Sequence, residues 1–576
     1  MNKHEIKKIL NNKYNRDEWK ILVKNIFNDT EYFKEPLSIK TENDKILDFV
    51  QIGNLKLSDN KKIALFELRL IKNLNIYKNK VELRNIVTKF IDQYSNHGVL
   101  VIFDNQGQDY RLTFSTKYSE IDKYGSIKNV ETSSKKYTYL LGETESCITP
   151  AERLHKLSLN NKKLKINNII EAFSVDKLTD QFFTDYKNLF LKINDSLTQI
   201  RKKDKKIDKN FIKNNIHNSE FAKRLLGQIV FIYFIQKKGW LGIKQNADGS
   251  FNKWGSGPKN FFKKLFNKDY CDYKNFFNDV LEPFFISLSE DLTENYSAKL
   301  KCKIPHLNGG LFEPLKNYDW LQTEILIEND IIKEIINVFD QYNFTIFEED
   351  EEESEVAIDP EMLGKVLENL ISIKDRKSKG IFYTPRQVVK YMVENSVFLY
   401  LKNSFKDENI TQDLSIFFKN EKLAQSNKFL KKNFKRIDDL LKNILICDPA
   451  IGSGAYPVEL MNFIVSLRRR LNVFFEDKKR SNYRLKLNFI KNSLFGNDID
   501  ESAIETSKLR LWLSLVIDED DYERIRSLPN LDFRITFGDS LTIVEKNLFN
   551  NDKLNELDIL KNEYFTQNNL RKKKTN

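Results

Sequence analysis

At 576 residues the chain is long enough for several domains, and its apolar (40%) and aromatic (12%) side chains suffice to bury several cores. This composition excludes an intrinsically disordered protein. The formal net charge of +12 suits a polyanionic partner such as nucleic acid, but abundant Lys and Asn are equally expected from an AT-rich genome, so the charge alone does not identify the partner.

Cysteine, histidine and apolar patterns exclude three further classes. The four cysteines lie far apart without a C-x-x-C pair, and the five histidines show no ligand spacing beside them, so we predict neither a disulfide framework nor a structural zinc site. The N-terminus lacks the apolar stretch of a signal peptide, and the longest apolar run, near 225–235, is too short to span a bilayer. We expect a cytoplasmic protein without a membrane partner.

The first part of the chain predicts a small α/β domain, residues 1–160. Short β-prone runs occur at 46–52, 63–70 and 99–103, and a basic helical stretch at 80–94 separates the last two.

The middle of the chain predicts a mainly α-helical domain, residues 161–345, because the apolar period becomes helical, as at 221–238. The acidic run 348–355 is typical of a solvated linker, with an interaction segment as the alternative. We therefore expect residues 346–375 to form an acidic linker and a connecting helix.

Residues 376–550 predict alternating strands and helices, which is the pattern of βαβ units with a parallel sheet. A polar helical tail, residues 551–576, follows. The expected elements are strands at 444–447, 493–496 and 533–537 and helices at 455–471 and 501–516.

The most informative stretch is 444–455, an apolar strand that enters a Gly-punctuated turn and then a helix. Gly452 and Gly454 remove Cβ atoms where a backbone approaches a ligand closely, and Asp448 places a carboxylate at the strand end, where ligands bind in such sheets. A carboxylate suits a cationic ligand. The Ala455-Tyr456 pair after the last glycine counts against both a phosphate loop and a dinucleotide fingerprint.

Two later strand ends repeat the combination of glycine and acid. Asp498 follows Gly496, where it would accept the two ribose hydroxyls of an adenosine, and Asp539 follows Gly538, where it would take the adenine amino group. Asp500 is equally well explained as a helix N-cap. Three successive strands that each end in Gly and Asp are hard to explain as caps alone.

These residues resemble a known family. The segment Asp448-Pro449-Ala450-x-Gly452-Ser453-Gly454 is similar to the cofactor motif of the γ-class N6-adenine-specific DNA methyltransferases, and Gly380-Ile381-Phe382-Tyr383-Thr384-Pro385 resembles the element that these enzymes place before it, against the methionine moiety. Upstream, Arg224-Leu225-Leu226-Gly227-Gln228 and Leu307-Asn308-Gly309-Gly310-Leu311-Phe312-Glu313 are similar to the fused type IIG restriction-modification enzymes. The resemblance covers about residues 45–565.

The resemblance implies a site-specific DNA methyltransferase that transfers a methyl group from S-adenosyl-L-methionine to N6 of adenine, with double-stranded DNA as its partner. It also implies an α/β fold with an incomplete Rossmann-like methyltransferase sheet, which follows the small α/β domain and the helical domain in the sequence. The cofactor-binding residues that it implies are Tyr383, Thr384, Pro385, Asp448, Ala450, Gly452, Gly454, Asp498, Ile499 and Asp539.

The chain departs from the family after Asp539, because nothing in it matches the catalytic N-P-P-Y motif. We therefore assign no catalytic residue to this chain and expect the sheet to be incomplete, with one unpaired edge at 444–447. The lysine run 572–574 suggests a frameshift, with a C-terminal methyltransferase half in an adjacent reading frame as the partner. The alternative is a catalytically inactive DNA- or protein-binding module, or a relic, of a phage-defence system.

Type IIG relatives often carry an N-terminal nuclease that binds a divalent metal such as Mg²⁺. The candidate ligands here are Asp59 and Glu67, with Asp48 as a further acid. Arg69 occupies the position of the catalytic lysine, and an arginine stays protonated, so we expect a degenerate nuclease that serves as a structural domain. The alternative is an active nuclease, and only that alternative would require magnesium.

Overall fold

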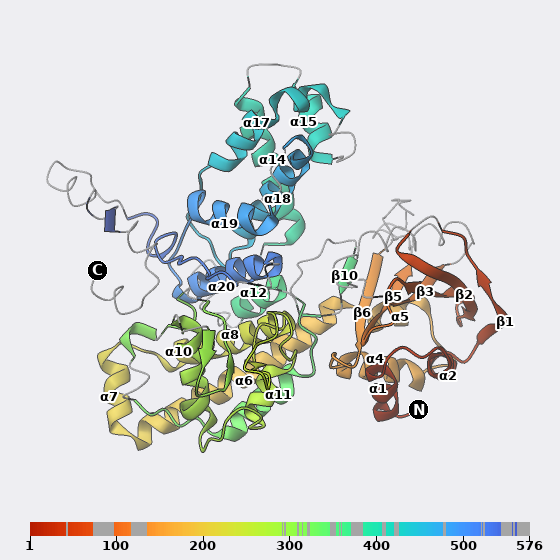
Figure 1. Ribbon diagram of the computed structural model, residues 1–576, viewed down its shortest axis with the longest axis horizontal. Helices are drawn as coiled ribbons and strands as arrows, with labels where there is room; N and C mark the ends of the chain where they lie inside the picture. Colours follow the sequence, from red (N-terminus) through yellow and green to blue (C-terminus); the bar gives the residue numbers. More distant parts are fainter. Residues whose placement is uncertain are drawn as a thin grey trace, which may run out of the picture. The chain divides into compact units, whose positions relative to one another are not determined.

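The computed structural model divides the chain into two compact units, each described by itself. The first contains Met1–Asp185 and Ile335–Asp359, and the second contains Tyr186–Glu334 and Pro360–Asn576 (Figure 1). The structure describes residues 1–41, 44–72, 97–116, 135–290, 292, 295–307, 310–313, 315–318, 323–345, 353–355, 357–358, 360–369, 384–405, 410–419, 426–475, 480–519, 521, 523, 525–542, 556 and 559–560.

The first unit is built on a mixed sheet. Among the described residues seven strands pair in the order β1-β2-β3-β4-β5-β6-β10, antiparallel except for the parallel pairs β3 with β4 and β6 with β10. The strands are β1 (Thr30–Ser38), β2 (Ile46–Lys56), β3 (Lys62–Leu70), β4 (Gly98–Asp104), β5 (Asp109–Thr116), β6 (Lys135–Gly142) and β10 (Glu353–Glu355). The strands predicted at 46–52, 63–70 and 99–103 are confirmed, whereas the helical stretch predicted at 80–94 lies outside the described residues.

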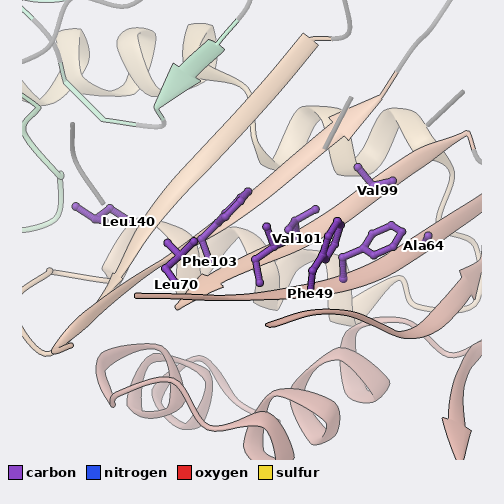
Figure 2. Packing of buried hydrophobic residues seen from close by; sticks show 9 residues of the cluster. Phe49, Ala64, Leu70, Val99, Val101, Phe103 and Leu140 are labelled. Atoms are coloured by element: carbon purple, nitrogen blue, oxygen red, sulfur yellow. The ribbon is translucent and has the colours of Figure 1, made fainter. Parts of the chain in front are cut away.

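The core of this unit explains why the central strands are apolar along their length. β3 and β4 are buried on both faces, and a strand with two covered faces needs a continuous apolar run. Figure 2 shows one of these faces, on which side chains of β2, β3, β4 and β6 pack together. The cluster contains Phe49, Ala64, Phe66, Leu68, Leu70, Val99, Val101, Phe103 and Leu140.

Four short helices of the described residues accompany this sheet, and side-chain caps start the first two. α1 (Lys3–Asn11) begins at Asn2, which forms a capping box with Glu5, and α2 (Arg16–Ile26) begins at Asn15, which accepts from two backbone N–H groups. α4 (Ile148–Leu159) and α5 (Ile166–Ala172) follow β6.

The acidic run predicted as a solvated linker is partly a strand. Of residues 348–355 the structure describes 353–355, and these form β10, which pairs in parallel with β6. Backbone pairing places this part of the run at the edge of the sheet, where its N–H and C=O groups find partners.

Helices dominate the first part of the second unit. They are α6 (Val175–Lys203), which carries the chain across the division at residue 185, α7 (Lys205–Lys213), α8 (Asn218–Lys237), α9 (Phe261–Phe266), the π-helix η1 (Phe277–Leu281), α10 (Glu282–Ser289) and α11 (Asn329–Phe339). The helix predicted at 221–238 is confirmed as α8. The strands β7 (Ile243–Lys244), β8 (Tyr296–Ser297) and β9 (Cys302–Lys303) form a small sheet that the helical pattern did not predict.

The second part of this unit alternates helices with parallel strands. The elements are α12 (Pro360–Asn369), α14 (Arg386–Asn403), α15 (Ile410–Lys419), α17 (Lys428–Asn443), β11 (Ile446–Asp448), α18 (Ala455–Arg470), α19 (Asn482–Asn492), β12 (Leu494–Asp498), α20 (Glu501–Asp518) and β13 (Ile535–Phe537). The described strands pair in the order β11-β12-β13, all in parallel. The predicted alternation and parallel pairing are confirmed for these strands, while the Rossmann-like methyltransferase sheet stays a prediction.

Helix α20 occupies a central place in this unit. It contacts α8 of the helical part and α12, α18 and α19 of the part that holds the parallel strands (Figure 1). Every helix among the described residues is too short or too polar to cross a lipid bilayer.

Candidate functional site

The turn between β11 and α18 needs glycine for two separate reasons. Gly452 and Gly454 both have positive φ, 53° and 79°, a conformation that costs an L side chain energy. A Cβ built at Gly454 would also lie 3.0 Å from Cβ of Ser507 on α20. At Gly454 the predicted role is therefore joined by a packing role against α20.

Asp448 and Asp498 end adjacent parallel strands, so their carboxylates lie at the same edge of the sheet. The N–H of Gly452 donates to Asp498 Oδ2 at 2.8 Å, and the N–H of Asp500 donates to Asp498 Oδ1 at 2.9 Å. The N–H of Ala450 donates to Asp448 Oδ1 at 3.2 Å. Asp498 thus ties the glycine turn to β12, and each of its oxygens keeps a second lone pair for a ligand.

The two carboxylates make this edge of the sheet electronegative. Burial raises the pKa of Asp448 above its ordinary value; the N–H of Ala450 opposes this shift, and the negative charge of Asp498 adds to it. A cation bound between the two acids would relieve both the burial and the repulsion. The arrangement therefore favours a positively charged ligand.

The end of β13 joins the same edge. Asn497 Nδ2 donates to the Gly538 carbonyl and to Ser540 Oγ, both at 2.8 Å, and the hydroxyl of Ser540 donates to the Pro449 carbonyl. These bonds connect the turns after all three strands. Asn497 was missed by the sequence reasoning, although a polar side chain inside a strand end was a usable signal.

Asp539 and Ile499 are exposed beside these turns. Asp539 Oδ1 accepts from the N–H of Leu541 at 2.9 Å, so in the free chain this acid caps its own turn. The side chain of Ile499 is 61% exposed. Both residues lie where a ligand at this edge would meet them.

The predicted element before the cofactor motif is described in part. Tyr383 lies outside the described residues, and Thr384 and Pro385 precede α14. In the first turn of this helix the Pro385 carbonyl accepts hydrogen bonds from the N–H groups of Val388 and Val389. α14 packs along α18, the helix that follows the glycine turn. Thr384 and Pro385 thus precede a helix that packs against α18.

A buried arginine that the sequence reasoning missed supports the glycine turn. Arg510 on α20 is 3% exposed, and its Nη1 donates to the Ser453 carbonyl at 3.1 Å. A Cβ built at Gly364 of α12 would lie 3.2 Å from Cδ of Arg510, so α12 fits closely over this side chain. An arginine inside the apolar helical sequence Leu509-Arg510-Leu511 was the available signal.

The N-terminal acids do not assemble into a metal site. Both oxygens of Glu67 accept from the Arg16 guanidinium, at 2.6 and 2.8 Å, and Oε2 also accepts from the Tyr14 hydroxyl at 3.0 Å. Asp59 lies in the turn before β3 and accepts from the N–H of Ile166. A strand rises about 3.3 Å per residue, so the five residues of β3 from Lys62 to Glu67 span roughly 17 Å. Glu67 and Asp59, which lies before Lys62, are therefore separated by about that distance.

Asp48 and Arg69 are register partners on β2 and β3, so Asp48 lies closer to Glu67 than Asp59 does. Within the described residues no group of three or more His, Cys, Asp or Glu side chains is arranged to hold a metal ion. The residues present therefore do not fit the magnesium of a nuclease, because an arginine already neutralises Glu67.

Comparisons with known proteins relate the chain to restriction-modification enzymes. No family model matches it. A protein of Methanocaldococcus jannaschii, whose name proposes a type II restriction enzyme and methyltransferase, is 29% identical over 408 residues, which are 64% of this chain and 32% of that protein. The match thus spans about a third of the relative.

Two solved structures are also similar over part of their length. One is the Type IIL restriction-modification enzyme MmeI in complex with DNA, at 13% identity and a TM-score of 0.39, covering 63% of this chain and 40% of that one. The other is a DrdV–DNA complex, at 13% identity and a TM-score of 0.27, covering 91% and 38%.

Proposed function

We propose that this chain is the cofactor-binding half of a cytoplasmic, adenine-specific DNA methyltransferase of the fused type IIG kind. The observation that carries the proposal is the pair of carboxylates, Asp448 and Asp498, at the ends of adjacent parallel strands beside the Gly452–Gly454 turn. The relationship to a protein named as a restriction enzyme and methyltransferase supports the same reading.

S-adenosyl-L-methionine supplies an activated methyl group on a positively charged sulfonium. In the proposed site Asp448 attracts the positive charge of the methionine part, and Asp498 accepts the ribose hydroxyls while it continues to hold the glycine turn. Asp539 exchanges its own-turn hydrogen bond for the adenine amino group, and the exposed Ile499 side chain packs on the adenine ring. Thr384 and Pro385 approach from the start of α14, Tyr383 binds with them as the family resemblance implies, and Ala450, Gly452 and Gly454 leave room for the ligand.

The proposed methyl acceptor is N6 of an adenine in double-stranded DNA. An enzyme that modifies a base flips it out of the stack and holds it by stacking and hydrogen bonds. The N-P-P-Y residues that do so in the family do not occur in these 576 residues, so we propose that a complementing C-terminal part of the methyltransferase holds the target adenine.

One face of the β11–β12 pair supports a contact with such a part. Strand side chains alternate between faces, and on the face opposite Leu494 the residues Leu445 and Phe495 are 73% and 37% exposed. Cys447, the register partner of Phe495, is also exposed on this face. Parallel sheets normally have both faces covered. The proposed C-terminal part would cover this apolar surface.

The proposal is tested by calorimetric titration of the purified chain with S-adenosyl-L-methionine. We expect binding to the wild type, a loss of at least about tenfold in affinity in Asp448→Ala (about 1.4 kcal/mol), and wild-type affinity in Asp439→Ala, which removes an exposed acid of α17. A folded wild type that does not bind would contradict the proposal and favour a catalytically inactive DNA- or protein-binding module.

A further inference from the structure

Helix α20 presents one face to the glycine turn between β11 and α18. Successive residues of a helix are rotated by 100°, so Ser507 and Arg510 share a face. Ser507 meets Gly454, and Arg510 donates to the Ser453 carbonyl, as described above. At the start of the helix Asp500 caps the N–H of Ser502 at 2.9 Å and donates its own N–H to Asp498. α20 therefore contacts the proposed site at three positions along its axis, through Asp500, Ser507 and Arg510.

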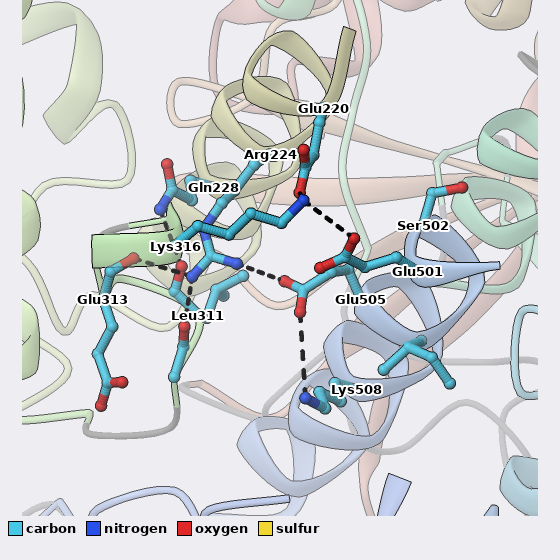
Figure 3. A network of polar contacts seen from close by, with 12 residues as sticks. Glu220, Arg224, Gln228, Leu311, Glu313, Lys316, Glu501, Ser502, Glu505 and Lys508 are labelled. Carbon is cyan, nitrogen blue, oxygen red and sulfur yellow. Dashed lines mark hydrogen bonds and ion pairs between the residues drawn. The ribbon is translucent and has the colours of Figure 1, made fainter. Parts of the chain in front are cut away.

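The opposite face of α20 is held by the helical part of the unit. Glu501, Glu505 and Lys508 lie roughly 180° around the helix from Arg510 by the same rotation. Arg224 of α8 donates from Nη1 to Glu505 Oε2 at 2.6 Å, and Lys316 forms an ion pair with Glu501 at 3.3 Å (Figure 3). α20 is thus enclosed between the cofactor turn and the helical part.

Arg224 also organises the loop that ends at Lys316. Its Nη2 donates to the carbonyls of Gly310 and Glu313, at 2.6 and 2.9 Å, and Gln228, one turn along α8, donates to the Leu311 carbonyl at 2.8 Å (Figure 3). Gly310 has a positive φ of 78°, which lets its carbonyl turn toward the guanidinium. The described residues 310–313 and 315–316 together with Arg224 and Gln228 are called the α20 clamp below.

The contacts of the clamp side chains depend on burial as well as on charge. The Arg224 side chain is 12% exposed and Gln228 is 2% exposed, so their hydrogen bonds are largely shielded from water. Lys316 pairs at once with Glu220 of α8 and Glu501 of α20. A second contact, from the N–H of Leu528 to the Leu307 carbonyl at 2.7 Å, ties the chain after α20 to the segment before the clamp.

We propose that Arg224 is a positioning residue for the cofactor site, acting through the axial and rotational position of α20. Loss of the Arg224–Glu505 contact lets α20 shift, which moves Ser507 and Arg510 away from the glycine turn and loosens the Asp500 cap beside Asp498. The helical part of the chain would then set the affinity for the cofactor without touching it. This inference rests on the proposed function for the identity of the ligand, but the order of the turn is observable without any ligand.

The experiment compares the full chain with Glu505→Gln and with a control, Lys253→Ala. Glu505→Gln keeps the size of the side chain and leaves the carbonyl contacts of Arg224 intact, so it should fold. The Lys253–Glu523 ion pair also joins the helical part to the segment after α20, but both side chains are more than 70% exposed. Hydrogen exchange of the ligand-free proteins reports on the turn, and calorimetry reports on S-adenosyl-L-methionine.

In Glu505→Gln we expect faster hydrogen exchange at residues 450–454 and 500–503 and a roughly threefold to tenfold weaker cofactor affinity. The substitution weakens a charge-assisted hydrogen bond, and α20 passes part of that loss of free energy on to the site. Lys253→Ala should change neither. A second variant, Arg224→Lys, retains the charge and should restore part of the affinity lost in Arg224→Ala.

The two proposals fail differently. If the wild type does not bind the cofactor but Glu505→Gln still loosens the turn, the positioning role stands and the proposed function fails. If Glu505→Gln leaves both the exchange of the turn and the affinity unchanged, or if exchange rises uniformly over the whole unit, the positioning role of Arg224 is overturned.

Discussion

The guanidinium of Arg16 binds both carboxylate oxygens of Glu67, across 51 residues of sequence, in a bidentate contact of 2.6 and 2.8 Å. Glu67 is 3% exposed and Arg16 is 32% exposed, so the contact joins α2 to the buried face of β3. An acid that the sequence offers as a candidate metal ligand is, in the folded chain, half of an ion pair.

Removal of Arg16 should destabilise the first unit, because it leaves a buried carboxylate whose remaining described side-chain donor is Tyr14. We expect Arg16→Ala to cost about 2 kcal/mol, less than a fully buried pair because Arg16 is a third exposed. The melting temperature of that unit should fall by about 4–8 °C. Lys156→Ala, which removes an exposed pair with Glu152 in the same unit, should shift it by under about 2 °C. Equal shifts in the two variants would contradict this prediction.

Magnesium should not bind the N-terminal unit. A ligand that binds only the folded state raises its melting temperature, and the Glu67 oxygens are already occupied by Arg16. We therefore expect calorimetric scans with and without millimolar Mg²⁺ to superimpose and supercoiled DNA to stay uncut. Cleavage that requires Mg²⁺ and disappears in Glu67→Gln would refute a purely structural role for this acid.

Substitution of Gly454 should harm the cofactor turn more than backbone strain alone predicts. Gly454→Ala combines a positive φ of 79° with a Cβ that lies 3.0 Å from Ser507, whereas Gly249→Ala has a similar φ of 82° and meets Gln245 only at 3.8 Å. The strain costs about 1–2 kcal/mol in each. We expect Gly454→Ala alone to weaken S-adenosyl-L-methionine binding, by at least about tenfold (about 1.4 kcal/mol), when both variants are measured by titration. Similar affinities would show that contact with Ser507 is unimportant.

Cofactor binding should weaken on acidification earlier than an ordinary aspartate would predict. Burial raises the pKa of Asp448, the Ala450 N–H lowers it in part, and the Asp498 charge raises it further. Since a cation is attracted only by the ionised form, affinity should be constant near neutral pH and fall as the pH approaches the raised pKa from above.

Titrations from pH 8 to pH 5 would measure this dependence, and Asp448→Asn should bind weakly with a flat profile. The sign of the stability effect is opposite: a raised folded-state pKa means that the ionised acid costs stability at neutral pH, so ligand-free Asp448→Asn should melt at a higher temperature than the wild type. A lower melting temperature would contradict the proposed electrostatic strain at this site.

The ion pairs of Asp438 should support stability down to low pH. Burial raises the pKa of this acid, but hydrogen bonds from Arg480 and Arg468 outweigh burial and lower it overall. A depressed folded-state pKa gives stability that is present above the ordinary aspartate value, about 3.9, and is lost as the pH falls through the folded value.

Asp438→Asn should therefore cost about 3–5 kcal/mol at neutral pH, because it leaves two arginines without a buried carboxylate. In thermal unfolding, the difference from the wild type should stay constant between pH 7 and pH 5 and narrow only below about pH 4. A difference that shrinks between pH 7 and pH 5 would assign the effect to another group.

The sequence by itself determined the elements whose signals are local. The apolar run at 444–447, the paired glycines and the following helical period predict β11, its turn and α18, because each depends on residues that are neighbours in the chain. The alternation after residue 440 likewise predicts parallel strands, whose carboxyl ends must share one edge, and this is why Asp448 and Asp498 could be named together in advance.

Only the tertiary structure decided which side chains meet across long separations. The partner of Glu67 is Arg16 rather than a metal shared with Asp59, Arg510 supports Ser453, and Arg224 holds Glu505 from 281 residues away. No periodicity encodes such contacts, because they depend on how whole elements pack and on the rotation of each helix about its axis. Local patterns thus predicted the glycine turn, and packing decided what holds that turn in place.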